Sequence, residues 1–297
     1  MHSCGRLAGL LVGPAVLLLG LAPPVAAGRS SATERLYVTV VDAKGRPVTG
    51  LTADDFAVRI DDANQEVAGL GPALEPASVV VLTDRLGLNA TYTPFDVGQT
   101  LREFAGAIRK GSQDAKLALT TFDGTVLQVA KFGGAPAELD RALGRLATGS
   151  DDAVLLDGLA DACQVMRSAP SSRRIIFTLV AAYRPDHSTM QPDVVGEILR
   201  LSGASLWVVE VRQAQGGNYG NPIREQILDN GSRLSGGFRE IVSSRSGLNT
   251  AVRHMAELIL AQYVLTYGPG GGSSRSIVAV TVKRPGVRVL TAGWTSR

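Results

Sequence analysis

The central part of the chain alternates apolar runs with segments whose apolar residues recur at helical spacing. Ser78–Thr83, Arg174–Ala182 and Ala204–Val211 are each almost wholly apolar, which is typical of strands buried on both faces of a parallel sheet. Amphipathic segments separate these runs, for example around residues 101–108, where the apolar side chains share one helical face. The pattern predicts an α/β domain with a doubly wound, mostly parallel sheet of the Rossmann-like type.

The segments on either side of this part consist of short runs in which apolar and polar residues alternate. Such runs occupy Leu36–Val41 and Phe56–Ile60 before the α/β part, and 262–267, 276–283 and 287–294 after it. Neither segment, at roughly 40 residues, is long enough to bury a core by itself. We therefore expect the two to pair into one small β-sandwich in which the α/β domain is inserted. The predicted boundaries are 34–75 for the first half of the sandwich, 76–260 for the α/β domain and 261–297 for the second half.

Residues 1–27 have the pattern of a signal peptide. Arg6 provides a positive charge, Leu7–Leu21 is an apolar stretch interrupted by Gly13-Pro14, and Val25-Ala26-Ala27 offers the small residues that a signal peptidase recognises. The apolar stretch is shorter than the roughly 20 residues that a membrane-spanning helix needs. We expect cleavage after Ala27, no membrane span in the mature chain, and a secreted or periplasmic protein.

The composition excludes several classes of protein. The chain is 45% hydrophobic and 19% charged, so it is not disordered throughout. The chain has 30 Lys and Arg residues and 27 Asp and Glu residues, and the basic residues form no dense run. This composition argues against a nucleic-acid partner. Cys163 is the only cysteine left after signal removal, and its apolar neighbours at helical spacing predict a buried, inert thiol.

The order of several motifs resembles the exported VWFA-related family of acidobacterial type, a von Willebrand factor type A-like fold. The opening VTVVDAKGRPVTGLTADDFAVRIDD (38–62) is similar to the segment that precedes the domain in that family, and LALTTFDGTVLQVAKF (117–132) to its hairpin. LSGGFREI (234–241), AELILAQYVLTYGP (256–269) and VAVTVKRPGVRV (278–289) are similar to its closing pattern. The resemblance covers most of the mature chain and implies a type A domain.

Type A domains usually bind a divalent cation at the carboxyl ends of the sheet strands, so the resemblance implies an Asp-x-Ser-x-Ser motif, a Thr and a further Asp. Here Asp84 matches the leading Asp, but Leu86 and Leu88 occupy the serine positions. Ala153 stands at the threonine position and Ala181-Ala182 where Asp-Gly is usual. Because Mg²⁺ and Mn²⁺ need oxygen ligands, we expect a degenerate metal-ion-dependent adhesion site with no tightly bound metal and no cofactor.

The resulting hypothesis is an exported, non-enzymatic module that binds a protein partner in the envelope or outside the cell. Three loops at one end of the sheet form the expected surface, and the Arg85 guanidinium is expected near Asp84, where an ion would lie. Arg and Tyr side chains contribute most to such contacts. The predicted surface residues are Asp84, Arg85, Tyr92, Asp151, Asp152, Tyr183, Arg184 and Asp186.

Two alternatives remain open. Asp84 with Asp151 and Asp152, and with the nearby Asp186, offers a displaced cation site, which would make the chain a cation-dependent adhesion domain. The simpler interpretation of Asp151 and Asp152 is negative charge in the first turn of a helix capped by Ser150. The second alternative is a hydrolase centred on His187 and Ser188, although the chain has no G-x-S-x-G, P-loop or H-E-x-x-H motif.

Overall fold

The computed structural model divides the chain into two units, Met1–Ser30 and Ser31–Arg297. The residues that it describes all belong to the second unit and are 33–85, 92–149, 153–181, 186–212, 222–268 and 276–294. The predicted signal peptide, with its cleavage site after Ala27, lies outside the described residues. The same is true of Leu86, Leu88, Asp151, Asp152, Tyr183 and Arg184.

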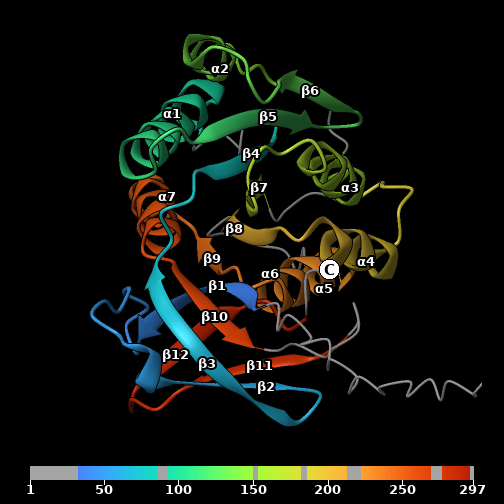
Figure 1. The fold of residues 1–297 in the computed structure, drawn as a ribbon. Coiled ribbons are helices and arrows are strands. Elements are labelled where there is room, and N and C mark those ends of the chain that lie inside the picture. The colour runs from blue at the N-terminus through green and yellow to red at the C-terminus, as the bar shows by residue number, and fades with distance from the viewer. Residues whose placement is uncertain are drawn as a thin grey trace, which may run out of the picture. The chain divides into compact units, whose positions relative to one another are not determined.

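A six-stranded sheet forms the central part of the fold, in the order β6-β5-β4-β7-β8-β9 (Figure 1). All neighbouring strands are parallel except β5 and β6, which form a hairpin. This is the strand order of a doubly wound sheet, so the predicted α/β class with a mostly parallel sheet is confirmed. The strands are β4 (Ala77–Asp84), β5 (Lys116–Phe122), β6 (Val126–Ala130), β7 (Arg173–Ala181), β8 (Ser205–Val211) and β9 (Arg239–Val242).

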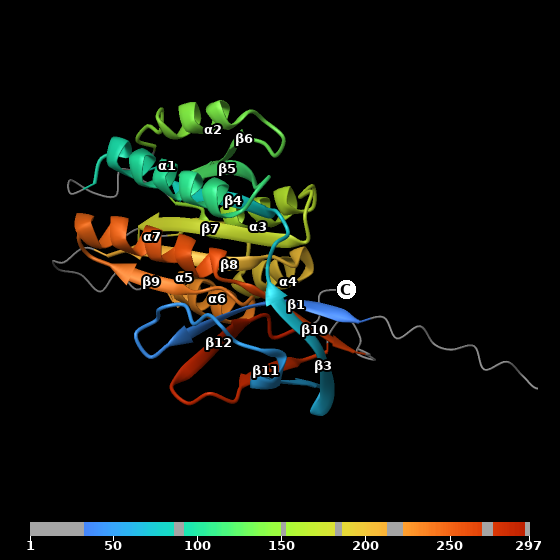
Figure 2. The ribbon, with the colours of Figure 1, turned by 60° about the vertical axis from the view of Figure 1, so that its left-hand side comes forward.

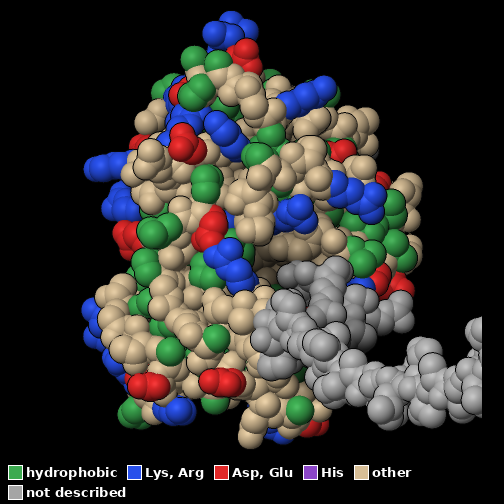
Figure 3. Space-filling model, in the orientation of Figure 1, with side chains coloured by type: hydrophobic (Ala, Val, Ile, Leu, Met, Phe, Trp, Pro, Cys, Tyr) green, Lys and Arg blue, Asp and Glu red, His purple; other side chains and the backbone are tan. Residues whose placement is uncertain are grey.

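Helices cover both faces of this sheet, with α1, α2 and α7 packed on one core and α3 and α4 on the other (Figure 2). No helix among the described residues is both long and apolar enough to span a bilayer. Acidic and basic side chains are interspersed on the face of the molecule shown in Figure 3. The helical segments are α1 (Pro94–Gly111), α2 (Pro136–Leu143), α3 (Leu155–Met166), α4 (Pro192–Ser202), α5 (Pro222–Gln226), the π-helical turn η2 (Ile227–Gly231), α6 (Ser232–Leu234) and α7 (Arg245–Leu260).

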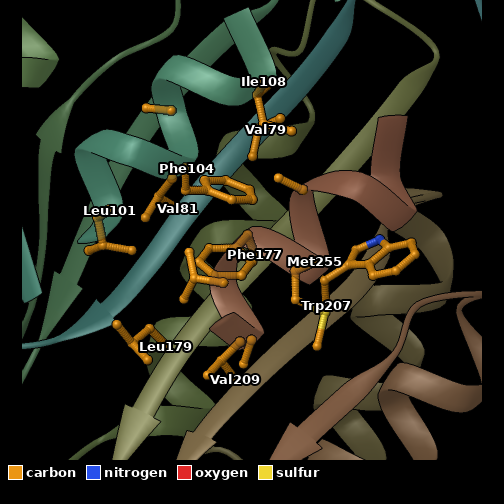
Figure 4. Packing of buried hydrophobic residues seen from close by; sticks show 14 of the residues in the cluster. Val79, Val81, Leu101, Phe104, Ile108, Phe177, Leu179, Trp207, Val209 and Met255 are labelled. Carbon is orange, nitrogen blue, oxygen red and sulfur yellow. The ribbon is translucent and has the colours of Figure 1, made fainter. Parts of the chain in front are cut away.

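Helix α1 shows how local sequence and packing agree. Thr93 and Asp96 form a capping box, in which each side chain accepts a hydrogen bond from the other residue's backbone N–H, and Pro94 follows the cap. The buried face of the helix carries Phe104, whose ring stacks on Phe177 of β7 with 4.0 Å between centroids (Figure 4). The helix thus begins at a signal in its own sequence and is held by the sheet.

The strands from the two ends of the chain pair with one another in a second, antiparallel sheet of order β11-β2-β3-β10-β1-β12. Strand β1 lies between β10 and β12, and a bridge between Ile277 and Trp294 joins the two outermost strands. The predicted sandwich of two sheets is not confirmed. The elements are β1 (Glu34–Asp42), the 3₁₀ turn η1 (Ala53–Asp55), β2 (Phe56–Ile60), β3 (Ala63–Pro72), β10 (Tyr263–Gly268), β11 (Val278–Val282) and β12 (Val287–Thr291).

One buried arginine bonds to both segments through which the chain passes between the two sheets. Arg173, the first residue of β7 and 2% exposed, donates from Nε to Gln262 Oε1 (3.0 Å) and from Nη1 to the Ala73 carbonyl (2.9 Å). Its Nη2 donates to the carbonyl of Ile259. Burial lowers the pKa of Arg173 to about 10, so the group remains charged at neutral pH.

The glycine pair before β9 accounts for part of the closing motif. Gly236 has a φ of +81°, which favours glycine, and a Cβ on Gly237 would overlap the carbonyl oxygen of Leu206. The chain therefore passes close to the backbone of β8 before it enters β9.

Cys163 is buried in α3, where burial raises the pKa of its thiol to about 12, so the prediction of an inert core cysteine is confirmed.

His254 of α7 connects two distant segments. Its Nδ1 lies 2.9 Å from Glu240 Oε2 in β9, and its Nε2 lies 2.9 Å from the carbonyl oxygen of Gly45, in the turn after β1. The hydrogen bond with Glu240 raises the pKa of His254, and the Gly45 carbonyl adds to this effect, while burial opposes it. A protonated ring donates to both partners at once and so joins the two sheets.

Arg173→Met is expected to lower the free energy of unfolding by about 3 kcal/mol or more, because each buried carbonyl left without a donor costs about 1–3 kcal/mol. Urea unfolding followed by circular dichroism measures the change. Arg167→Met, at an exposed position after α3, is the matched control and is expected to have little effect. A loss below about 1 kcal/mol for Arg173→Met would contradict the role of this guanidinium.

The stability contribution of His254 is expected to depend on pH. Because its folded pKa is raised, the contribution is fully present below the ordinary value of 6.5 and is lost as the pH rises through the folded pKa. The gap in melting temperature between the natural protein and His254→Gln should therefore be larger at about pH 5 than at about pH 9. Glu240→Gln should remove most of this pH dependence; an equal gap at both pH values would refute the assignment.

Candidate functional site

The candidate site lies at the carboxyl ends of the central strands. Strands β4 and β7 are neighbours, but the chain leaves them in opposite directions, towards β5 and β8 respectively. In doubly wound sheets ligands bind at such a switch point. Asp84 ends β4 at this point and is 3% exposed, so the residue that matches the first metal ligand of type A domains has the position that the sequence predicted.

Arg85 follows directly and is held by the backbone on both sides. Its N–H donates to the Phe122 carbonyl (2.8 Å), and its own carbonyl accepts from Gly149 (3.2 Å). The guanidinium Nη2 lies 3.3 Å from Asp123 Oδ2, and the Arg85 side chain is 29% exposed. A fixed positive charge thus lies beside the end of β4, where it forms an ion pair with Asp123. Asp123 lies in the segment 117–132 that the sequence predicted as a hairpin, and this pair was not predicted.

Hydrogen bonds within its own hairpin orient the Asp123 carboxylate towards Arg85. One carboxylate oxygen, Oδ1, accepts from the Thr125 N–H (2.9 Å) and hydroxyl (3.2 Å), which is the short-range bonding typical of Asp in turns. The other oxygen faces Arg85. The carboxylate is almost fully buried, so the turn and the ion pair together hold it in one orientation.

Asp186 is not an exposed loop residue, which corrects its prediction as part of the contact surface. Its side chain is 2% exposed and lies 3.7 Å from Arg224 Nε. Oδ2 accepts from the N–H of Leu155, the first residue of α3, and Oδ1 accepts from the N–H of Ser188. The carboxylate therefore stabilises the start of α3, where backbone N–H groups lack helical partners.

Ser188 takes part in the same cap. Its Oγ accepts from the N–H groups of Leu156 (2.9 Å) and Asp157 (3.3 Å). In return, the Asp157 carboxylate accepts from the N–H groups of Thr189 and Met190. The neighbouring His187 is exposed, and its backbone N–H donates to the Ala153 carbonyl. Helix capping therefore accounts for the position of Ser188, and no catalytic role is needed to explain it.

Tyr92 also differs from the prediction of an exposed contact residue. The structure buries it to 2% exposure in the core beneath α1, and this burial raises the pKa of its hydroxyl. The hydroxyl has no hydrogen-bond partner among the described residues. The ring is therefore part of the packing that holds the start of α1, and a partner at the surface does not reach it.

The described residues do not fit the divalent cation that the resemblance implies. Ala153 and Ala181, which stand at ligand positions, are fully buried and carry no side-chain oxygen. Within the described ranges, no group of three or more His, Cys, Asp or Glu side chains is placed to hold a metal ion. Of the alternative set Asp84, Asp151 and Asp152, only Asp84 is described.

A third ion pair with a buried carboxylate lies at this edge of the sheet. Glu210, 1% exposed near the end of β8, pairs with Arg239 of β9. Arg212 and Glu225 extend the pair, because Arg212 bonds to both glutamates and Glu225 accepts from Arg239. This network was not predicted, although a single Glu within the apolar run Ala204–Val211 was a usable signal.

A cavity of about 680 Å³ lies at the opposite end of the sheet. Its polar lining is engaged within the fold: Tyr37 bonds to Ser172, Tyr267 donates to Glu34, and Arg173 is the junction arginine described above. We interpret it as a gap at the junction of the two sheets and place the candidate site at the carboxyl ends.

Family models and curated protein sequences provide no match to the chain. Similar solved structures include a von Willebrand factor type A protein from Catenulispora acidiphila, with 12% identity, a TM-score of 0.46 and coverage of 90% of this chain and 75% of that one. Proximal thread matrix protein 1 from the mussel byssus, with a zinc-occupied MIDAS motif, has 14% identity, a TM-score of 0.49 and coverage of 67% and 50%. The pilus adhesin SpaC from Lactobacillus rhamnosus GG has 11% identity, a TM-score of 0.46 and coverage of 82% and 47%.

This chain spans about half the length of the mussel protein and of the pilus adhesin. Likenesses at these identities and TM-scores carry no argument about what the chain binds. The fold itself is established by the order of the six central strands and by the helices on both faces. This arrangement is the doubly wound α/β class that the resemblance to von Willebrand factor type A domains predicted.

Proposed function

We propose that this chain is an exported, non-enzymatic protein-interaction module of the von Willebrand factor A type that works without a metal ion. One observation carries the proposal: three buried carboxylates at the carboxyl edge of the sheet each lie beside an arginine. Asp123 lies beside Arg85, Asp186 beside Arg224 and Glu210 beside Arg239. The positive charge that a metal supplies in other type A domains is here part of the protein.

The chemistry of these groups supports metal independence. A guanidinium remains charged at any physiological pH and forms directional bonds with carboxylates. A divalent cation would have to compete with that charge while finding oxygen ligands, and Ala153 and Ala181 supply none. The capping role of Ser188 supports a non-enzymatic function, because its oxygen already accepts two backbone hydrogen bonds.

The contact surface that we propose is smaller than the sequence suggested. Arg85 is partly exposed next to the switch point, whereas Tyr92 and Asp186 are buried and belong to the support beneath the surface. Tyr183 and Arg184 follow β7 in the chain and remain proposed contacts. Arginine and tyrosine side chains at such positions suit a protein partner, in the envelope or outside the cell, because they dominate contact energies in interfaces.

Thermal melts in excess Mg²⁺, in excess Ca²⁺ and in EDTA are expected to superimpose. A cation that binds the folded chain at 100 times its dissociation constant adds about 2.7 kcal/mol and would shift the midpoint by several degrees. Asp84→Asn is the matched variant. A cation-dependent shift in the natural protein that this variant abolishes would establish a cation-dependent adhesion domain and overturn metal independence.

Affinity capture from the envelope of the exporting cell tests the surface. The chain from Gly28 onwards is immobilised beside the variant Arg85→Ala/Tyr183→Ala and the control Arg167→Ala, whose exposed side chain follows the far end of α3. The natural chain and the control are expected to retain the same partner, measured by quantitative mass spectrometry, and the double variant to lose it. Equal capture by all three removes this surface from consideration.

A further inference from the structure

The groove between strand β6 and helix α2 is a separate feature beside the candidate site. β6 is an edge strand of the central sheet, and α2 packs near it on the face that α1 also covers. A cavity of about 500 Å³ lies between them, within the size range of ligand-binding clefts. The lining residues that matter below are Arg85, Leu127, Val129, Arg141, Arg145 and Leu146.

The groove has an apolar side that no described residue covers. Leu127 and Val129 are 51% and 41% exposed, and their spacing of two places them on the same face of β6. Leu146, which follows α2, adds a further partly exposed apolar side chain on the opposite side of the groove. Aliphatic side chains of a bound segment would remove this apolar surface from water.

The groove also has uncompensated positive charge. Arg85 forms a salt bridge with Asp123. Arg109 of α1 forms a salt bridge with Asp140 of α2. Arg141 and Arg145, in contrast, have no salt bridge among the described residues and are exposed. Glu138 is the one acidic residue in the lining, so the groove has a net positive charge.

We propose that this groove binds an extended acidic segment of a partner protein, whose aliphatic side chains contact Leu127 and Val129 and whose carboxylates pair with Arg141 and Arg145. Charge complementarity selects the acidic partner, and the apolar strip selects a peptide, because the lining has no aromatic ring on which a nucleic-acid base could stack. Arg85 joins the groove to the carboxyl edge. The inference thus rests on the proposed interaction function and specifies a partner chemistry for it.

Fluorescence anisotropy with labelled peptides of about eight residues tests the groove. A peptide that alternates Glu and Leu is expected to bind the chain from Gly28 onwards, with an affinity that falls as salt is added. A Lys/Leu peptide is expected not to bind, and a Glu/Ser peptide to bind at least about tenfold more weakly. Equal binding of the Lys/Leu peptide, or of the Glu/Ser peptide, would overturn the proposal.

Substitutions in the groove test whether the peptide binds there. Arg141→Gln/Arg145→Gln is expected to weaken binding of the Glu/Leu peptide about tenfold, because the variant removes two exposed charge pairs. Leu127→Ser is expected to weaken it as well. The control Arg167→Gln/Arg233→Gln removes the same charge from exposed positions after α3 and on α6 and should bind normally. Thermal melts confirm that each variant is folded; unchanged binding by the folded arginine pair variant refutes the proposal.

The two proposals fail in different ways. If the natural chain captures a partner through Arg85 and Tyr183 but the Glu/Leu peptide does not bind, the groove assignment is wrong and the interaction function stands. If the peptide binds as expected but the Arg85→Ala/Tyr183→Ala variant captures the same partner as the natural chain, the proposed surface is wrong and the groove stands.

Discussion

The buried guanidinium of Arg173 bonds to both points at which the chain passes between its two sheets. It reaches the carbonyl of Ala73, before β4, the carbonyl of Ile259, in the last turn of α7, and the side chain of Gln262, between α7 and β10. The two passages also bond directly, because the Ala73 N–H donates to the Gln262 carbonyl. This junction allows an α/β domain to be inserted between the paired ends of the chain, since it satisfies the backbone where regular structure stops.

Because the junction lies at the amino ends of the parallel strands, the carboxyl ends are available for the contact surface that we propose. There the fold uses arginine to balance buried carboxylates, as in the pairs Arg85 with Asp123 and Arg239 with Glu210. Such pairs are costly to desolvate but hold their members in fixed orientations. In the metal-independent site that we propose, these arginines supply the positive charge. The groove beside α2 continues the same positive character along the sheet edge.

Much of the fold was predictable from local sequence. Continuous apolar runs marked β4, β7 and β8, because strands covered on both faces admit few polar residues. The alternating runs at both ends marked the second sheet, although not its arrangement. The position of Asp84 at the end of β4 followed from the same reasoning. The burial of Tyr92 and Asp186 did not, because neither residue has a periodic neighbourhood that indicates whether the loop around it turns inward.

The sequence by itself determined the strand and helix pattern, the inert Cys163 and the lack of oxygen ligands at Ala153 and Ala181, because each depends on residue type and on neighbours a few positions away. Only the tertiary structure decided how the buried charges and the start of α3 are satisfied. The sequence predicted Ser150 as the start of the helix that contains Cys163; instead α3 begins at Leu155, and its N–H groups bond to Asp186 and Ser188. These partners lie about thirty residues away in the chain, and only folding brings them together.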